Sequence, residues 1–148
     1  MTTRDRFVKE AMTWLDTPWQ HQARVKGVAV DCAMFVVGAA YNVGLMTDED
    51  LKMIPNYPKD WHFHNTESML IPIVESFDVE EIEPEKAIRG DVILFKVGRC
   101  ESHMGIKLPN DYFIHAYGAL SINKVVKMRL DERWKSRLTK AYRFKGIK

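Results

Sequence analysis

The spacing of hydrophobic positions changes about halfway along the chain. In the first half they recur every three or four residues, which is typical of amphipathic helices. In the second half they alternate or form short continuous runs, which is typical of strands. The pattern predicts a first helix over residues 5–15. It predicts a second helix that begins at Asp31 or Cys32, runs to about Asn42 and ends at Gly44.

A polar connection over residues 46–65 follows, with two prolines and room for one helical turn. Residues 66–77 are predicted as a third helix with Thr66 as its N-cap, although Pro72 disfavours a regular helix there. Five strands are predicted after that point, together with a helical turn within residues 131–138. The strands cover residues 90–97, 102–108, 111–117, 124–130 and 140–147. Helices followed by strands indicate an α+β fold, with N-terminal helices packed on a C-terminal antiparallel meander sheet.

Size and charge narrow the classes of protein to consider. The 148 residues, 46% of them hydrophobic, are enough for one packed domain, which we expect to span residues 1–148. The 22 basic and 20 acidic residues are spread along the chain, so no nucleic-acid partner and no anionic membrane surface is indicated. No run of apolar residues reaches the length of a membrane span, and residues 1–10 lack the apolar core of a signal peptide. We therefore expect synthesis in the cytoplasm without a signal peptide.

The second helix begins with an aspartate followed by a cysteine. Asp31 as N-cap places Cys32 in the first turn, where the helix dipole favours the thiolate and free N–H groups can stabilise an oxyanion. This position predicts a nucleophile with a lowered pKa. The alternative is a small core residue, because free cysteine is often buried. The other cysteine, Cys100, is also expected to be a thiol.

A thiolate nucleophile needs a base, and His103 and His115 are the informative candidates. A three-residue turn over residues 108–110 would place His103 directly opposite His115, with Cβ atoms about 4.5 to 5.5 Å apart. The two histidines would then share one sheet face with Gly105, whose missing side chain leaves a gap. A two-residue turn would send the histidines to opposite faces. Cys32 followed by two histidines has the chain order of papain-like chemistry.

A zinc site is the competing interpretation of some of these residues. Cys100, His103, His62 and His64 could be ligands, but their spacing matches no closed ligand set. No metal and no cofactor is therefore expected.

Four segments, TPWQHQARVKGVAVDCAMFV, RGDVILFKV, ESHMGIKL and YFIHAYG, carry a family resemblance. In order and approximate spacing they resemble the motifs of NlpC-type cell-wall cysteine peptidases, in particular the branch of tailed phages and gene-transfer agents. The resemblance covers residues 17–119 and implies a papain-like fold. It implies Cys32 as nucleophile, His103 as general base and His115 as the residue that orients His103.

The chain departs from the family pattern at two places. Members commonly carry an oxyanion-binding tyrosine about a dozen residues before the cysteine, and here Trp19 lies nearest, with His21 and Gln22 beside it. Together with Asp31 these are the candidate contacts to substrate or oxyanion, and pocket wall or simple packing is the alternative for the tryptophan segment. The second departure is Met34, where the family usually has glycine.

The resemblance implies hydrolysis of an amide in the peptide stem of peptidoglycan. It also implies phage tail proteins as partners and action on the cell wall from a virion tail or a prophage product. Two alternatives remain open. One is a papain-like amidase or acyltransferase that acts on another amide, and the other is a catalytically inactive module that binds the wall or a tail. Arg24 and Lys26 could pair with carboxylates of a stem peptide, although exposure is the simpler interpretation.

Overall fold

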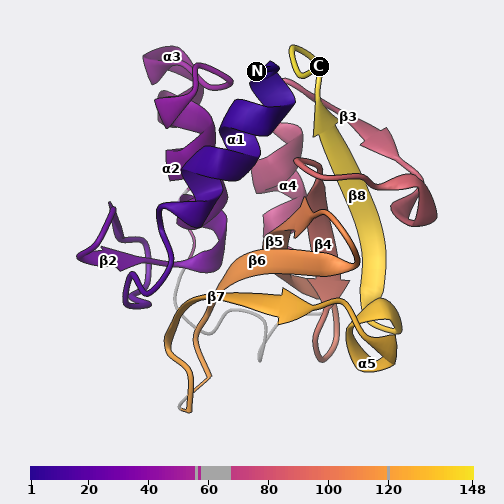
Figure 1. Ribbon diagram of the computed structural model, residues 1–148. Helices are drawn as coiled ribbons and strands as arrows, with labels where there is room; N and C mark the ends of the chain where they lie inside the picture. Colours follow the sequence, from indigo (N-terminus) through magenta and orange to yellow (C-terminus); the bar gives the residue numbers. More distant parts are fainter. Residues whose placement is uncertain (56, 58–67, 120) are drawn as a thin grey trace.

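The helices lie mainly in the N-terminal half of a computed structural model, which describes residues 1–55, 57, 68–119 and 121–148. The helices are α1 (Thr3–Met12), α2 (Cys32–Asn42), α3 (Asp48–Lys52), α4 (Leu70–Glu75), the 3-10 helix η2 (Pro84–Lys86) and α5 (Glu132–Lys135). Figure 1 shows α1 to α4 grouped beside the sheet, with α5 apart from them. In the described residues, no helix combines the length and apolar character that crossing a membrane requires.

The main sheet has six antiparallel strands in the order β3-β8-β4-β5-β6-β7. These are β3 (Val79–Ile82), β4 (Val92–Lys96), β5 (Glu101–Leu108), β6 (Tyr112–Tyr117), β7 (Lys124–Arg129) and β8 (Leu138–Phe144). A two-stranded ribbon joins β1 (Arg24–Val25) to β2 (Ala29–Val30) just before α2.

The predicted α+β class is confirmed, and most predicted elements are present with shifted ends. The helix expected over residues 5–15 spans Thr3–Met12, and the third helix is shorter than predicted, with its expected cap Thr66 outside the described residues. The predicted meander, in which consecutive strands pair with each other, is found only from β4 to β7. The last strand, β8, returns to pair with β4, and the unpredicted β3 pairs with its outer edge. Strand order depends on contacts between distant segments, which the local pattern does not encode.

The predicted alignment of β5 with β6 is wrong by two residues. Leu108 pairs with Tyr112, so the three-residue turn covers residues 109–111 rather than 108–110. His103 is therefore not directly opposite His115. Because the error is an even number of residues, both histidines still lie on one face of the sheet, as predicted.

The sheet is covered on both faces. Helices α1, α2 and α4 pack on the face that carries Met104, Ile106 and Ile114. On the opposite face, Trp134 of α5 packs with Phe95 and Phe113 in a smaller cluster. The helix that carries Cys32 is thus held against β5 and β6 by the larger core.

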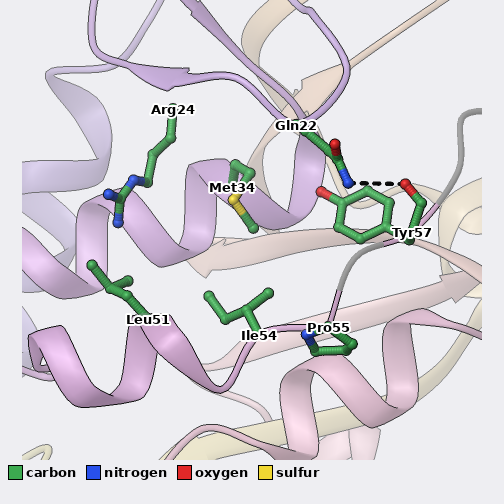
Figure 2. A pocket seen from close by; sticks show the side chains of 7 residues that line it. All are labelled: Gln22, Arg24, Met34, Leu51, Ile54, Pro55 and Tyr57. Atoms are coloured by element: carbon green, nitrogen blue, oxygen red, sulfur yellow. Dashed lines mark hydrogen bonds between the residues drawn. The ribbon is translucent and has the colours of Figure 1, made fainter.

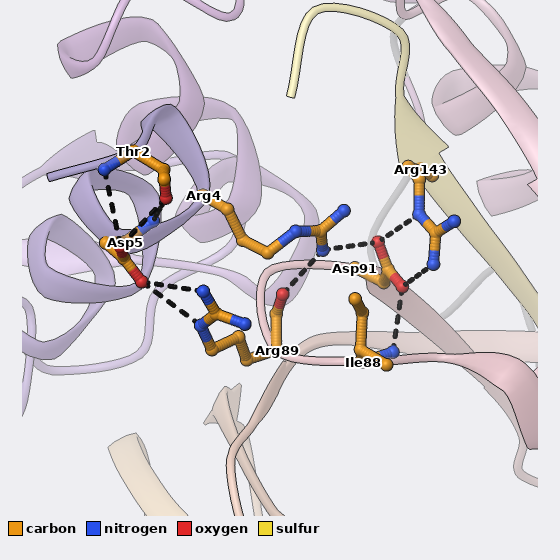
Figure 3. Close-up of polar contacts among 7 residues, drawn as sticks. All are labelled: Thr2, Arg4, Asp5, Ile88, Arg89, Asp91 and Arg143. Carbon is orange, nitrogen blue, oxygen red and sulfur yellow. Dashed lines mark hydrogen bonds and ion pairs between the residues drawn. The ribbon is translucent and has the colours of Figure 1, made fainter. Parts of the chain in front are cut away.

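A buried ion network fastens α1 to the sheet (Figure 3). Arg4 donates to Asp91 Oδ1 at 3.0 Å, and Arg143 of β8 donates to both carboxylate oxygens at 3.0 and 2.8 Å. The N–H of Ile88 donates to Oδ2 at 2.8 Å. Asp91 is fully buried, and these charge-assisted bonds compensate for its lost hydration.

Candidate active site

The start of α2 is built around a buried carboxylate, as the sequence predicts. Asp31 is the N-cap, and its Oδ1 accepts from the N–H of Met34 at 2.8 Å. Its Oδ2 accepts from the N–H of Gln22 at 2.7 Å and from the hydroxyl of Tyr57 at 2.6 Å. Three donors hold the carboxylate, so the first turn and Cys32 have a fixed position.

The thiol of Cys32 lies against β5. The residue is partly exposed, but protein surrounds the sulfur, and the N–H groups of Met104 and Ala33 are directed at it. Burial raises the pKa of the Cys32 thiol to about 12, with a further increase from the Asp31 carboxylate. The structure therefore contradicts the lowered pKa expected from the helix start. Desolvation and a neighbouring negative charge outweigh the helix dipole.

The two predicted histidines are brought together by a hydrogen bond of 2.5 Å between His103 Nε2 and His115 Nδ1. The regular backbone pairing of β5 with β6 ends at Ile106 and Ile114, and the two histidines lie just beyond it. Cys32 meets the backbone of Met104, next in sequence to His103. The histidine rings themselves contact Phe95, Phe113 and Trp134 of the smaller cluster.

Aromatic rings enclose the histidine pair. Trp134 has its ring centroid 5.9 Å from His103 and 5.3 Å from His115, and Tyr117 stacks on His115 at 5.2 Å. Burial lowers the pKa of His103 to about 3. It also lowers the pKa of His115 to about 2, with a smaller contribution from His103. Both imidazoles are therefore neutral near pH 7.

The hydrogen bond between the rings restricts the tautomers. If His103 is to accept a proton on Nδ1, its own hydrogen must lie on Nε2 and be donated to His115 Nδ1. The hydrogen of His115 then lies on Nε2. This atom is buried and has no hydrogen-bond partner within the part of the chain that the structure describes.

Gly105 provides the space for this arrangement. A Cβ atom at Gly105 would lie 3.0 Å from the carbonyl oxygen of Ile114 and 3.2 Å from the Cβ of His115. Both neighbours belong to the backbone or its first side-chain atom, so neither can rotate away. The predicted gap at this glycine is thus filled by the adjacent strand.

The remaining predicted residues divide into two groups. Gln22 and His21 lie by Asp31 and Tyr57: the Gln22 side chain donates to the carbonyl of Tyr57 at 2.9 Å, and the His21 ring meets the Tyr57 ring edge to face. The backbone of Trp19 pairs with Val30, the residue before Asp31, and its indole ring lies near Gly118. A Cβ atom at Gly118, which follows β6, would come within 2.9 Å of its indole ring.

Sequence reasoning missed Tyr57, because it lies in the polar connection and no local motif marks it. It also underestimated Arg24, which is half-buried rather than exposed. Cys100 is buried, with 3% of its surface exposed, and forms no disulfide with Cys32. Of the four ligands weighed for zinc, His62 and His64 lie outside the described residues. No group of three potential metal ligands is found in the rest of the chain.

The comparisons with known proteins concern the family and the fold. The sequence profile of the NlpC/P60 family matches residues 16–143. A search of curated protein sequences gave no match.

Solved structures show the same fold at low identity. A lipoprotein-like NLP/P60 family protein from Staphylococcus aureus superposes with a TM-score of 0.63 at 19% identity over 96% of this chain and 41% of its own. The NlpC/p60 domain of the peptidoglycan hydrolase SagA gives 0.64 at 16% identity, covering 95% and 97%. The peptidoglycan hydrolase RipB from Mycobacterium tuberculosis gives 0.61 at 21% identity, covering 99% and 65%. The chain thus spans less than half of the first of these proteins and nearly all of the second.

Proposed function

Because the chain belongs to the NlpC/P60 family, we propose that it is a cysteine endopeptidase that cleaves an amide bond in the peptide stem of peptidoglycan. The observation that carries the proposal is the hydrogen-bonded pair of His103 and His115, beside which the thiol of Cys32 meets β5. Two structural neighbours, SagA and RipB, are described as peptidoglycan hydrolases.

The neutral state of the groups defines the first step of the proposed reaction. The Cys32 thiol transfers its proton to Nδ1 of His103 as the sulfur attacks the substrate carbonyl carbon, because neither group is ionised at rest. His115 accepts from Nε2 of His103 and so keeps the ring in the required orientation. The enclosing rings keep water from the imidazoles until the proton moves.

The developing oxyanion would lie at the start of α2. The N–H of Met34 is occupied by Asp31, which leaves the N–H groups of Cys32 and Ala33 as the donors of the first turn. His103 then protonates the leaving amine, and the acyl group stays on sulfur. Water, deprotonated by His103, releases the acid and restores the thiol.

The test is mass spectrometry of muropeptides after incubation with the wild-type protein and, in parallel, with Cys32→Ala. A stem-peptide product formed only by the wild type supports the proposal and identifies the bond. Cleavage by both proteins would show that Cys32 is not the nucleophile.

A catalytically inactive wall-binding module is favoured by one observation, the raised pKa of the Cys32 thiol. That alternative predicts binding to peptidoglycan with no new product from either folded protein. Hydrolysis of a non-stem amide, with stem peptides left intact, would instead identify a different papain-like amidase.

The proposed place of action is a phage tail, and its support is the resemblance of the four sequence segments to the phage and gene-transfer-agent branch. Mass spectrometry of purified tails should detect the chain. Detection only in extracts of the producing cells would contradict this part of the proposal.

A further inference from the structure

A cavity of about 420 Å³ lies beside α2, on the side of the helix that faces α3 (Figure 2). Residues that precede α2 and described residues between Leu51 and Tyr57 form its other walls. It is lined by Gln22, Arg24, Met34, Leu51, Ile54, Pro55 and Tyr57. The side chains of Met34, Leu51, Ile54 and Pro55 are apolar, and those of Gln22, Arg24 and Tyr57 carry polar groups, a mixture that suits a ligand with both kinds of group.

One end of the cavity adjoins the proposed nucleophile. Tyr57 lines the cavity and donates to Asp31, the residue next to Cys32. Burial raises the pKa of Tyr57, and the neighbouring Asp31 carboxylate contributes. Met34, two residues after Cys32, lines the same space.

Arg24 lines the cavity as well, and its stem lies across α2 one turn beyond Met34. Gly38 permits this approach, because a Cβ atom there would lie 3.3 Å from Cγ of Arg24. The guanidinium lies 5.6 Å from the ring centroid of Tyr41. Gly38 is six residues after Cys32, which corresponds to about 9 Å along the helix.

The guanidinium of Arg24 pairs with no carboxylate in the described part of the chain, whereas Lys26, two residues on, pairs with Glu10 at 2.7 Å. The nearby carboxylates of α3 are engaged elsewhere. Asp48 accepts from Tyr41, Glu49 pairs with Lys52, and Asp50 accepts from Thr47. A half-buried, uncompensated guanidinium on a cavity wall favours an anionic ligand group.

We propose that this cavity is a substrate subsite in which Arg24 binds a carboxylate of the peptide while Met34, Leu51 and Ile54 contact the intervening aliphatic atoms. The inference rests on the proposed peptidase function. The bound carboxylate would lie along α2 from the nucleophile, near Gly38 and Tyr41, so this contact supplies binding energy remote from the reaction.

Binding measured by calorimetry in a Cys32→Ala background tests the subsite without turnover. The probes are the tetrapeptide L-Ala-γ-D-Glu-meso-diaminopimelyl-D-Ala and the same tetrapeptide with every carboxyl group converted to carboxamide. The acid should bind roughly tenfold more tightly than the amide. Arg24→Gln should abolish this preference, and Lys26→Gln, the matched control, should retain it.

Equal affinity for the two probes, or no binding of either, would overturn the inference, and so would an equal loss of the preference in the Arg24 and Lys26 variants. Cleavage of the acid tetrapeptide by the wild type, measured in parallel, reports on the proposed function separately. Cleavage of the tetrapeptide together with equal binding of the acid and amide probes would support the peptidase function and contradict the subsite.

Discussion

Asp91 and His115 are both fully buried polar side chains, but their surroundings differ. Both oxygens of Asp91 accept hydrogen bonds, from two arginines and from a backbone N–H. His115 has one bond, to His103, and its Nε2 is without a partner in the described residues. Buried polar groups are almost always satisfied when their role is structural. The contrast indicates that Asp91 holds the fold together, whereas the unsatisfied His115 carries a cost to stability that fits the orienting role proposed for it.

The largest expected effect on stability comes from removing the fully hydrogen-bonded carboxylate of Asp91. Asp91→Ala leaves Arg4 and Arg143 without their shared anion, and it should lower the free energy of unfolding by about 3–5 kcal/mol. The matched control is Glu81→Ala, which removes the more exposed pair with Lys140 and should cost much less. Urea denaturation measures both. Equal losses of unfolding free energy would show that the buried ion network stabilises the fold no more than the exposed pair does.

The second effect is the loss of stability when the buried histidine pair must be protonated. In the folded protein the pKa values of His103 and His115 are about 3 and 2, and in the unfolded chain each is near 6.5, so the unfolded state binds more protons below that pH. Stability should therefore fall as the pH drops below 6.5, by up to about 1.4 kcal/mol per histidine for each pH unit.

Unfolding experiments between pH 6.5 and 5.5, where carboxylates contribute least, would measure this slope. His115→Gln removes one of the two groups and should give a shallower dependence on pH than the wild type. An unchanged slope would show that His115 is protonated in the folded protein.

The third effect concerns the orientation of His103. His115→Ala removes the acceptor for His103 Nε2 and should lower kcat by roughly tenfold, about 1.4 kcal/mol. His115→Gln, whose amide oxygen can accept that bond, should retain more activity. Stem-peptide cleavage rates compare the variants, and equal rates would show that His115 orients nothing.

The smallest effect is on the thiol itself. Asp31→Asn removes the negative charge beside Cys32 and should lower the midpoint of thiol alkylation by about one pH unit, while asparagine preserves the helix cap. Asp48→Asn, on the surface of α3, is the matched control and should leave the midpoint unchanged. In the wild type we expect the midpoint above the free-cysteine value of about 8.5. A lower midpoint would contradict the dominance of burial.

The local sequence predicted what depends on local structure. Asp31 as cap and α2 as helix follow from a capping residue before an apolar run, and the shared face of His103 and His115 follows from alternation. The exact pairing of β5 with β6 could not be predicted, because it depends on where the turn closes.

Features that depend on distant segments were missed. Tyr57 reaches Asp31 across 26 positions, and β8 joins β4 rather than the neighbouring β7. The pKa of Cys32 was misjudged for the same reason. The helix dipole can be deduced from the local sequence, whereas the burial that outweighs it results from packing against β5.

Gly105 has a consequence for how the chain tolerates mutation. Every other residue type adds a Cβ atom, which here would meet the carbonyl of Ile114 and the Cβ of His115. In a saturation scan scored for activity, we therefore expect position 105 to reject substitutions as strictly as Cys32 or His103, although it contributes no chemical group. Variation among descendants of this protein should leave a glycine there for as long as the neighbouring histidine is in use.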